Sequence, residues 1–393
     1  MRSVVLFGLG LGLAASLLHC AANDPSPGTP DAGGLDAGDT EADGSSDAAE
    51  PVDDDASDAG LVGDAGNCSV DNWCRVALPP NVSPSAVWTF APNDALAVGS
   101  GGMIHWDGTS WSVVTDQDDQ GAGLDGLSNL WASGPGDVWA VTRWDRRLVH
   151  GTRTGLGAAF TWSSSETSSL EAIELVAGRP GELWISGHLA DQTPMLERAD
   201  VTGGGPPSFV QVPLPPVNDL YVRDLWVSPN GEVWFVGGGD DGLSFVAHGQ
   251  RSGDDVVWTR SLLVGPNTID LTAIDGIEGA TTPAEQNDVW VLGTGKANFH
   301  HALLPDGGQL WSPFPNSTNM ELTALWMSGK DDAWAAGNIG FIRHWDGTSW
   351  KISQLSVGGR PIFEALTSIH GSSPNDIWAV GPNILVHHTG GGK

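Results

Sequence analysis

Histidine is the first residue type in this chain whose repetition suggests chemistry. Imidazole transfers protons near neutral pH and is the commonest metal ligand in proteins, so a ring of histidines could bind a metal ion. Equivalent residues of different repeats lie far apart, however, and the two histidine pairs lack a third ligand at useful spacing. We therefore expect no metal site and expect these histidines to hydrogen-bond within their own hairpins. They end similar apolar segments: His105, His150, His248, His300, His301, His344, His387 and His388.

The acidic segment from Asp116 to Gly121 resembles the start of an EF-hand calcium loop. In such a loop the twelfth residue is a glutamate that binds calcium through both carboxylate oxygens. Counted from Asp116, the twelfth residue here is Leu127. We therefore expect a solvated acidic loop and no calcium site.

Glycoside hydrolysis of the sialidase type needs a nucleophilic tyrosine with a partner glutamate, an arginine cluster and a catalytic aspartate. The chain has one tyrosine, Tyr221, which stands beside Val222 in a strand-like segment, and its few arginines are scattered. No set of nucleophile, base and orienting residue is recognisable elsewhere. We expect the protein not to be an enzyme, to have no catalytic residues and to need no cofactor.

The best candidate for ligand binding is an aromatic residue among cations. Trp144 lies beside Arg143 and close to Arg146 and Arg147, in a repeat whose third strand departs from the pattern. An exposed tryptophan among arginines can stack on a sugar or anchor a protein partner. We expect Arg143, Trp144, Arg146 and Arg147 to form a binding surface, with either a protein or a glycan as ligand.

These residues belong to an internal repeat of about 45 residues. One residue of each unit, usually tryptophan, marks the repeat, and successive marks are 43, 45, 50, 56, 44 and 44 residues apart. Seven units of this length predict an all-β, seven-bladed β-propeller, in which each blade has four strands. The marking residues are Leu96, Trp139, Trp184, Trp234, Trp290, Trp334 and Trp378.

Each unit is expected to contain four strands, a to d. Strand a ends eight residues before the mark in every unit but the fifth, which has an insertion around Gly279 to Asn287. Strand b shows little alternation of apolar and polar residues, so both of its faces should be buried. Asp-Gly should form a tight turn between strand c and a strand d that begins with Thr-Ser-Trp.

The ends of the repeat predict how the ring closes. The last unit ends after Ile384 to His388 without a fourth strand, whereas an extra strand, Asn72 to Val76, precedes the first unit. If Trp73 stands where Trp111 and Trp350 stand in their units, this strand completes the seventh blade and covers an open edge. Cys68 and Cys74 can pair in an exported protein and would fix the closing strand.

The Trp-Asp-Gly-Thr-Ser-Trp motif at 106–111 and 345–350 carries a resemblance. Over residues 72–393 the chain resembles bacterial lipoproteins with β-propeller repeats, and it is loosely similar to the Asp-box (BNR) family of sialidase-like propellers. A full Asp-box, Ser-x-Asp-x-Gly-x-Thr-Trp, is absent. The resemblance implies the fold and says little about the ligand.

The first residues are typical of an export signal. Arg2 precedes an apolar run from Val4 to Leu18, which is short for a transmembrane helix. Leu17 to Cys20 then resembles a lipobox, after which bacterial lipoproteins are cleaved and lipidated on the cysteine. Lipidation of Cys20 would also account for the odd one of three cysteines. The alternative is cleavage after Ala22, which would release a soluble, secreted protein.

Residues 23–66 form an acidic segment with 13 aspartates and glutamates and no aromatic, lysine or arginine residue. Such a composition cannot bury enough apolar surface to fold, so we expect a disordered tether. The net charge of the chain is −31, and without the 13 tether acids and Arg2 it is still −19. This charge argues against nucleic acid as a partner, because nucleic acid is bound by clustered lysine and arginine.

We therefore expect a signal peptide at residues 1–19, a lipid-anchored disordered linker at 20–66 and a monomeric propeller at 67–393. It would act in the cell envelope, at the outer membrane or cell surface, and touch the membrane through its lipid alone. Its long loops, Thr115 to Gly126, Gly237 to Gly242 and Gln354 to Glu364, should open on one face and bind or scaffold an unknown protein or glycan. A glycoside-active enzyme and an envelope assembly factor remain alternatives.

Overall fold

A computed structural model describes residues 67–390 of the protein, apart from 143–145, 167, 204, 241, 254, 264–269, 296, 305–307 and 314–319. The predicted signal, Cys20 and the acidic tether lie outside the described residues. The described residues all belong to one compact unit, 57–393. Within them, no helix is long and apolar enough to cross a membrane.

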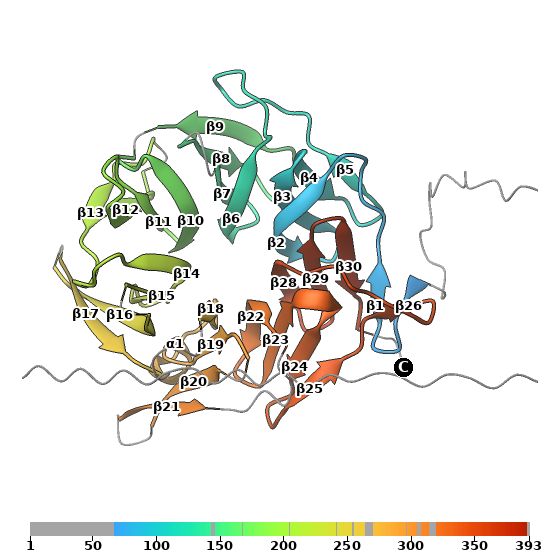
Figure 1. The fold of residues 1–393 in the computed structure, drawn as a ribbon. Helices are drawn as coiled ribbons and strands as arrows, with labels where there is room; N and C mark the ends of the chain where they lie inside the picture. The colour runs from blue at the N-terminus through green and yellow to red at the C-terminus, as the bar shows by residue number, and fades with distance from the viewer. Residues whose placement is uncertain are drawn as a thin grey trace, which may run out of the picture. The chain divides into compact units, whose positions relative to one another are not determined.

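Seven four-stranded antiparallel sheets are arranged in a ring, which confirms the predicted seven-bladed β-propeller (Figure 1). Blade 1 comprises β2 (Ser83–Ala91), β3 (Asp94–Ser100), β4 (Gly102–Trp106) and β5 (Trp111–Val113). Blade 2 comprises β6 (Leu127–Gly134), β7 (Asp137–Thr142), β8 (Leu148–Thr152) and β9 (Thr161–Ser165). Blade 3 comprises β10 (Ala172–Arg179), β11 (Glu182–His188), β12 (Pro194–Asp200) and β13 (Val210–Val212). Blade 4 comprises β14 (Tyr221–Val227), β15 (Val233–Gly238), β16 (Ser244–Ser252) and β17 (Asp255–Ser261). Blade 5 comprises β18 (Leu271–Gly276), β19 (Val289–Gly293), β20 (Asn298–Leu303) and β21 (Gln309–Pro313). Blade 6 comprises β22 (Leu322–Gly329), β23 (Asp332–Gly337), β24 (Ile342–Trp345) and β25 (Trp350–Ser353), and blade 7 comprises β28 (Ser368–Ser373), β29 (Asp376–Gly381), β30 (Ile384–His388) and β1 (Trp73–Arg75).

The second strand of each blade is almost wholly buried, as the lack of alternation predicted. In β3, β15, β19 and β29 nearly every residue is buried, because the blade packs between two neighbouring blades. The marking tryptophans of this strand are at most 3% exposed and form much of the core between blades: Trp139, Trp184, Trp234, Trp290, Trp334 and Trp378.

The turn between the first two strands follows the predicted spacing with one correction. In the third blade Trp184 lies opposite Ala177, not Val176, because the β10–β11 turn has no bulge of the kind found in blades 1, 2, 6 and 7. The insertion expected in the fifth unit forms a short helix, α1 (Pro283–Gln286). Its first turn is capped reciprocally by Thr282 and Glu285.

The connection from the third to the fourth strand is longer than predicted. The fourth strand begins at Trp111, which pairs with Trp106, so Thr109 and Ser110 belong to the loop and not to the strand. Asp107 Oδ1 accepts hydrogen bonds from the backbone N–H groups of Thr109 at 2.8 Å and Ser110 at 2.9 Å. The aspartate therefore organises a four-residue loop through its side chain, as aspartates at turns commonly do.

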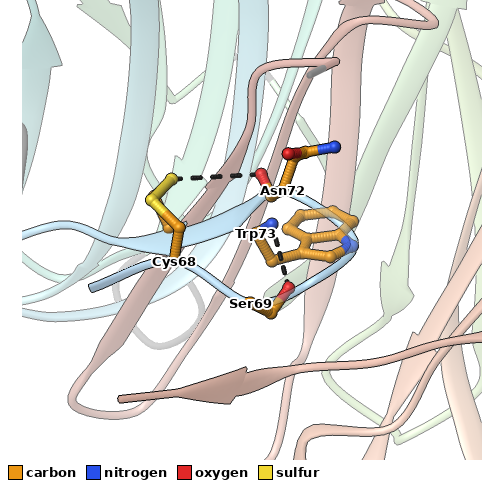
Figure 2. The surroundings of a disulfide bond; sticks show 5 residues. Cys68, Ser69, Asn72 and Trp73 are labelled. Atoms are coloured by element: carbon orange, nitrogen blue, oxygen red, sulfur yellow. Dashed lines mark hydrogen bonds between the residues drawn. A yellow bond between two sulfur atoms is a disulfide. The ribbon is translucent and has the colours of Figure 1, made fainter. Parts of the chain in front are cut away.

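The ring closes with the N-terminal strand, as predicted. β1 pairs with β30 and places Trp73 opposite His388, the position that matches Trp111 and Trp350 in their blades. Trp73 is fully buried, and its Nε1 donates to Ser353 Oγ of the neighbouring blade at 3.0 Å. The predicted disulfide joins Cys68 to Cys74 beside it, and Ser69 Oγ accepts from the backbone N of Trp73 (Figure 2).

The segment from Gln354 to Glu364, expected as an open loop, is folded. β26 (Ser356–Val357) and β27 (Arg360–Pro361) form a hairpin. Leu355 and Ile362 beside it are buried in the same core cluster as Trp73. This segment therefore stabilises the closure of the ring and leaves Phe363, 71% exposed, as its main apolar surface residue.

We predict that Trp73→Ala destabilises the domain by about 3–5 kcal/mol, the usual cost of truncating a buried tryptophan. The variant also loses the hydrogen bond to Ser353 that links blades 6 and 7. Urea unfolding of the variant and the unchanged protein measures the difference. Val70→Ala, in the same segment but 77% exposed, is the matched control and should be neutral. Equal stability of the two variants would show that β1 does not hold the ring closed.

Candidate functional site

The first strand of each blade faces the centre of the ring (Figure 1). Side chains from the first strands of all seven blades, together with the turns that follow several of them, line one central cavity of about 260 Å³. The cavity combines indole rings with carboxylates and one histidine: Trp88, Trp131, Trp226 and Trp326; Asp224, Asp275 and Glu278; and His370.

Polar side chains in this cavity connect neighbouring blades. The first strand of each blade is a sheet edge, so its inward backbone groups need partners from outside the sheet. At matching positions of blades 2, 4 and 7, a side-chain atom accepts from a backbone N of the next blade: Asn129 Oδ1 from Val176 at 3.1 Å, Asp224 Oδ2 from Ile274 at 2.8 Å, and Ser368 Oγ from Val87 at 3.2 Å. At the position two residues further along the first strand, Asp275 Oδ2 accepts from the backbone N of Met327, and His370 Nδ1 accepts from the backbone N of Thr89, each at 3.0 Å.

Tryptophans fill the remaining contacts between the innermost strands. The indoles of Trp131, Trp226 and Trp326 lie against glycines of the following blades, where an added Cβ would come within 2.9, 2.5 and 2.6 Å of the rings. The glycines are Gly178, Gly276 and Gly371. A side chain at any of them would displace the indole, so blades 2, 4 and 6 supply a large residue and blades 3, 5 and 7 supply the space.

Burial changes the acidity of two carboxyl groups in the cavity. Burial raises the pKa of Asp224 to about 7. Burial raises the pKa of Asp275 well above its usual range, and the neighbouring Glu278 and Asp224 add to this. Among the described residues, no lysine or arginine forms an ion pair with Asp224 or Asp275. Arg179 also lines the cavity, but its guanidinium pairs with Glu182 at 2.9 Å. The cavity therefore has an excess of acid.

His370 joins the carboxylates to the aromatic wall. Its Nδ1 accepts the hydrogen bond from Thr89, so the ring proton lies on Nε2, which is 3.3 Å from Glu278 Oε1. The imidazole is stacked on Trp88 with 4.1 Å between ring centroids. This tautomer makes His370 a donor to Glu278, and it helps to hold that carboxylate at the cavity wall.

Six of the eight recurring histidines make the predicted hydrogen bond within their hairpin, whereas His301 bonds the backbone O of Asn287 and His388 Nδ1 is buried without a hydrogen-bond partner in the described residues. The six bond a carboxylate at or just before the start of the second strand, at 2.6 to 3.1 Å: His105, His150, His248, His300, His344 and His387. All but His105 also stack on the marking tryptophan of their blade, with 3.7 to 4.1 Å between ring centroids. Each hydrogen bond joins strands of one blade, so these histidines stabilise the hairpins.

In blades 2, 6 and 7 a serine joins this arrangement. In blade 7, Ser372 donates to Asp376 Oδ2, while His387 bonds Oδ1 of the same carboxylate at 2.7 Å. The three residue types are those of a hydrolytic triad, but here the aspartate stands between serine and histidine. Nucleophile activation requires the histidine in the middle, where it can take the hydroxyl proton. This network can therefore position strands but cannot activate the serine.

The structure describes two of the four predicted binding residues, Arg146 and Arg147, and their surroundings differ. Arg146 is on the surface and pairs with Glu171 at 3.1 Å. Arg147 is largely buried: its Nη2 donates to Gly123 O at 2.5 Å, and its Nη1 lies 3.9 Å from Asp118 Oδ2. It therefore holds the loop before β6. Arg143 and Trp144 lie outside the described residues, so a binding surface formed by all four remains a prediction.

The acidic segment from Asp116 to Gly121 is exposed, as expected of a solvated loop, except for Asp118. Asp118 is buried, and its Oδ1 accepts from the backbone N–H groups of Gln120 at 3.0 Å and Ala122 at 2.8 Å. The carboxylate thus shapes the loop from inside. Across the described ranges, no cluster of three or more histidine, cysteine, aspartate or glutamate residues could hold a metal ion.

The central cavity was not among the sequence predictions, although the sequence contains a signal for part of its packing. The first strands contain Leu-Trp in blades 2, 4 and 6 and a small or polar residue followed by glycine in blades 3, 5 and 7. This alternation indicates which first strands supply the tryptophan and which supply the glycine that it packs against. Tyr221, the only tyrosine, lies at the start of β14, where its hydroxyl donates to Asp270 at 3.5 Å and Arg223 packs over its ring.

Comparison with solved structures supports the fold. YCF48 bound to a D1 peptide has 17% identity and a TM-score of 0.58, over 81% of this chain and 97% of that chain. YCF48 from Cyanidioschyzon merolae has 15% identity and a TM-score of 0.57, over 81% and 98% of the two chains. The β-propeller domain of Cps50 (Swd1) from Myceliophteria thermophila has 10% identity and a TM-score of 0.55, over 80% and 98%. No protein-family model and no curated protein matches the chain.

We predict that Asp224→Asn gains stability relative to the unchanged protein as pH rises from 4 to 8. With a folded-state pKa of about 7, Asp224 keeps a proton in the folded protein that the unfolded chain has already lost above about pH 4. Unfolding then releases a proton, so this carboxyl group lowers the free energy of unfolding as pH rises toward 7. Asparagine does not titrate, and it occupies the matching position in blade 2 as Asn129.

Urea unfolding at pH 5 and pH 8 tests this prediction. The difference between variant and unchanged protein should favour the variant more at pH 8 than at pH 5. An equal difference at both pH values would show that Asp224 is already ionised at pH 5.

Proposed function

We propose that this protein is a binding propeller that holds a protein partner by a basic side chain in the central cavity. The observation that carries this proposal is the combination of four indoles with three acids in one cavity, where Asp224 and Asp275 form no ion pair with any lysine or arginine that the structure describes. An ammonium or guanidinium group is attracted both to carboxylates and to the faces of aromatic rings.

The size of the cavity favours one side chain over a metabolite. Pockets for drug-sized ligands have volumes of roughly 300–1,000 Å³, whereas this cavity has about 260 Å³. A lysine or arginine from a partner could enter it while the rest of the partner rests on the surrounding turns. A cation would also favour the ionised forms of Asp224 and Asp275, so binding should release protons and strengthen as pH rises through about 7.

Two further considerations support a binding role. One similar propeller, YCF48, was solved with a peptide bound, so a related architecture is compatible with peptide recognition. The serine, aspartate and histidine networks lack the order that nucleophilic catalysis requires.

We further propose that the propeller acts in the cell envelope as a lipoprotein. The apolar segment of residues 4–18 and the lipobox-like sequence ending at Cys20 support export and lipidation. The acidic residues 23–66 would then tether the domain at a distance from the membrane. Release as a soluble protein after cleavage at Ala22 is the competing possibility, and an assembly factor would use the same anchor and the same cavity.

The cavity proposal is tested with an array of extended peptides that differ only in a central lysine, arginine, glutamine or leucine. The full mature protein should bind the lysine or arginine peptides more tightly than the neutral ones. Glu278→Gln should weaken binding of the basic peptides about tenfold or more, the usual effect of removing one charge-assisted contact. Binding is measured by fluorescence anisotropy, and melting temperatures confirm that the variants fold.

Glu171→Gln is the matched control, because Glu171 is an exposed glutamate that pairs with Arg146 on the surface. It should bind like the unchanged protein. Equal binding of basic and neutral peptides would overturn the proposal. So would a glycan array in which sugars bind the unchanged protein and are lost on Glu278→Gln, since the cavity would then recognise a glycan.

We predict that the mature protein begins at Cys20 and carries lipid on that residue. Lipidation attaches a lipid to the cysteine that becomes the N-terminus, so the intact mass should exceed that of the polypeptide from Cys20 by the mass of this lipid. Intact mass spectrometry of the protein from membranes gives this value. A mass matching an unmodified N-terminus at Asn23 would show secretion instead.

A further inference from the structure

Blade 3 departs from the arrangement that the other blades repeat. At the start of its second strand, Glu182 matches Asp137 of blade 2 and Glu232 of blade 4, but its hydrogen bonds come from arginines and a tryptophan and not from a histidine. Opposite Trp184, at the position of the stacked histidine, is Arg198. Departures from a repeat that is otherwise kept for stability are a sign of specialisation.

Glu182 is fully engaged by other residues. Its Oε2 accepts from Arg179 Nη2 and from Arg251 Nη1 of blade 4, both at 2.9 Å, and its Oε1 accepts from Trp184 Nε1 at 2.7 Å. The carboxylate is largely buried. Glu182 therefore fixes two guanidinium groups side by side and has no further oxygen directed at Arg198.

Among the residues that the structure describes, Arg198 has no partner inside the domain. Its guanidinium forms no hydrogen bond or ion pair with any residue that the structure describes, although it is close enough to Asp200 to contribute to the lowered pKa of that carboxyl group, after two hydrogen bonds from Thr202. Arg179 Nε is also buried with no hydrogen-bond partner in the described part of the chain.

The three arginines line one cavity of about 450 Å³ between blades 3 and 4. Three of the 13 arginines of this acidic chain thus meet at one place, opposite two carboxylates that are already hydrogen-bonded, Glu182 and Asp200. A planar guanidinium with free donors is suited to bidentate binding of a carboxylate or another oxyanion. Arg179 and Pro180 line both this cavity and the central one, so the two cavities adjoin.

We propose that this cavity is an oxyanion site that takes the carboxylate of an aspartate or glutamate side chain of a protein partner, with Arg198 as its main contact and Arg179 and Arg251 held behind it by Glu182. The choice of a protein carboxylate rests on the proposed function, because one extended segment could place a basic residue in the central cavity and an acidic residue here. The oxyanion site itself rests only on the geometry of blade 3 and of Arg251 from blade 4.

The test uses short extended peptides that contain one glutamate and no basic residue, each paired with its glutamine counterpart. The full mature protein should bind the glutamate peptides more tightly, and added NaCl should weaken this binding. Arg198→Gln should reduce it about tenfold or more and change the melting temperature little, because Arg198 forms no hydrogen bond or ion pair with the described residues and its nearest carboxylate, Asp200, is exposed. Arg360→Gln, an exposed arginine on β27, is the matched control and should bind like the unchanged protein.

The outcomes separate the two proposals. Binding of glutamate peptides that depends on Arg198, together with no binding of the basic peptides, would support the oxyanion site while the central-cavity proposal fails. Equal binding of glutamate and glutamine peptides, or no effect of Arg198→Gln, would overturn the oxyanion site. If sulfated glycans bind through Arg198 and glutamate peptides do not, the assignment to a protein carboxylate is overturned.

Discussion

The contact between innermost strands of neighbouring blades is the constraint on which this structure depends. Each innermost strand is an open sheet edge, so it must satisfy backbone N–H groups and fill space against a different sheet. Tryptophan meets glycine at the contacts from blade 2 to 3, 4 to 5 and 6 to 7. Seven is an odd number, so the alternation cannot continue around the ring. It breaks at blade 1, where Trp88 lies between His370 and Trp131.

This break bears on the chemistry of the central cavity. Because Trp88 has no glycine opposite it in the next blade, its indole stacks on His370 and remains partly accessible at the cavity wall. His370 in turn orients Glu278. The aromatic and acidic character of the cavity thus follows in part from the odd number of blades, because large and small residues cannot alternate all the way around a ring of seven.

The architecture was predictable because its signals are local in sequence. Repeats of about 45 residues, fixed hairpin spacing and an unpaired strand at each end determine seven blades and their closure through Trp73. The central cavity was not predicted, because its residues come from seven segments whose side chains meet only once the ring is formed. The contacts of Arg147 could not be predicted either, because Gly123 and Asp118 lie more than 20 residues earlier in the chain and meet it only in the folded blade.

The charge distribution relates the two cavities to each other. With a net charge of −19 outside the tether and Arg2, the domain attracts basic partners over long distances but does not by itself select among them. Selection requires groups that penalise the wrong partner, and an arginine cavity in an acidic protein has that effect. A bound segment that carries only positive charges would bring a like charge close to Arg198 and be repelled. A segment with a correctly spaced acidic residue would bring a carboxylate there instead. Opposite charges in adjoining cavities would therefore fix both the identity of the segment and the direction in which it lies.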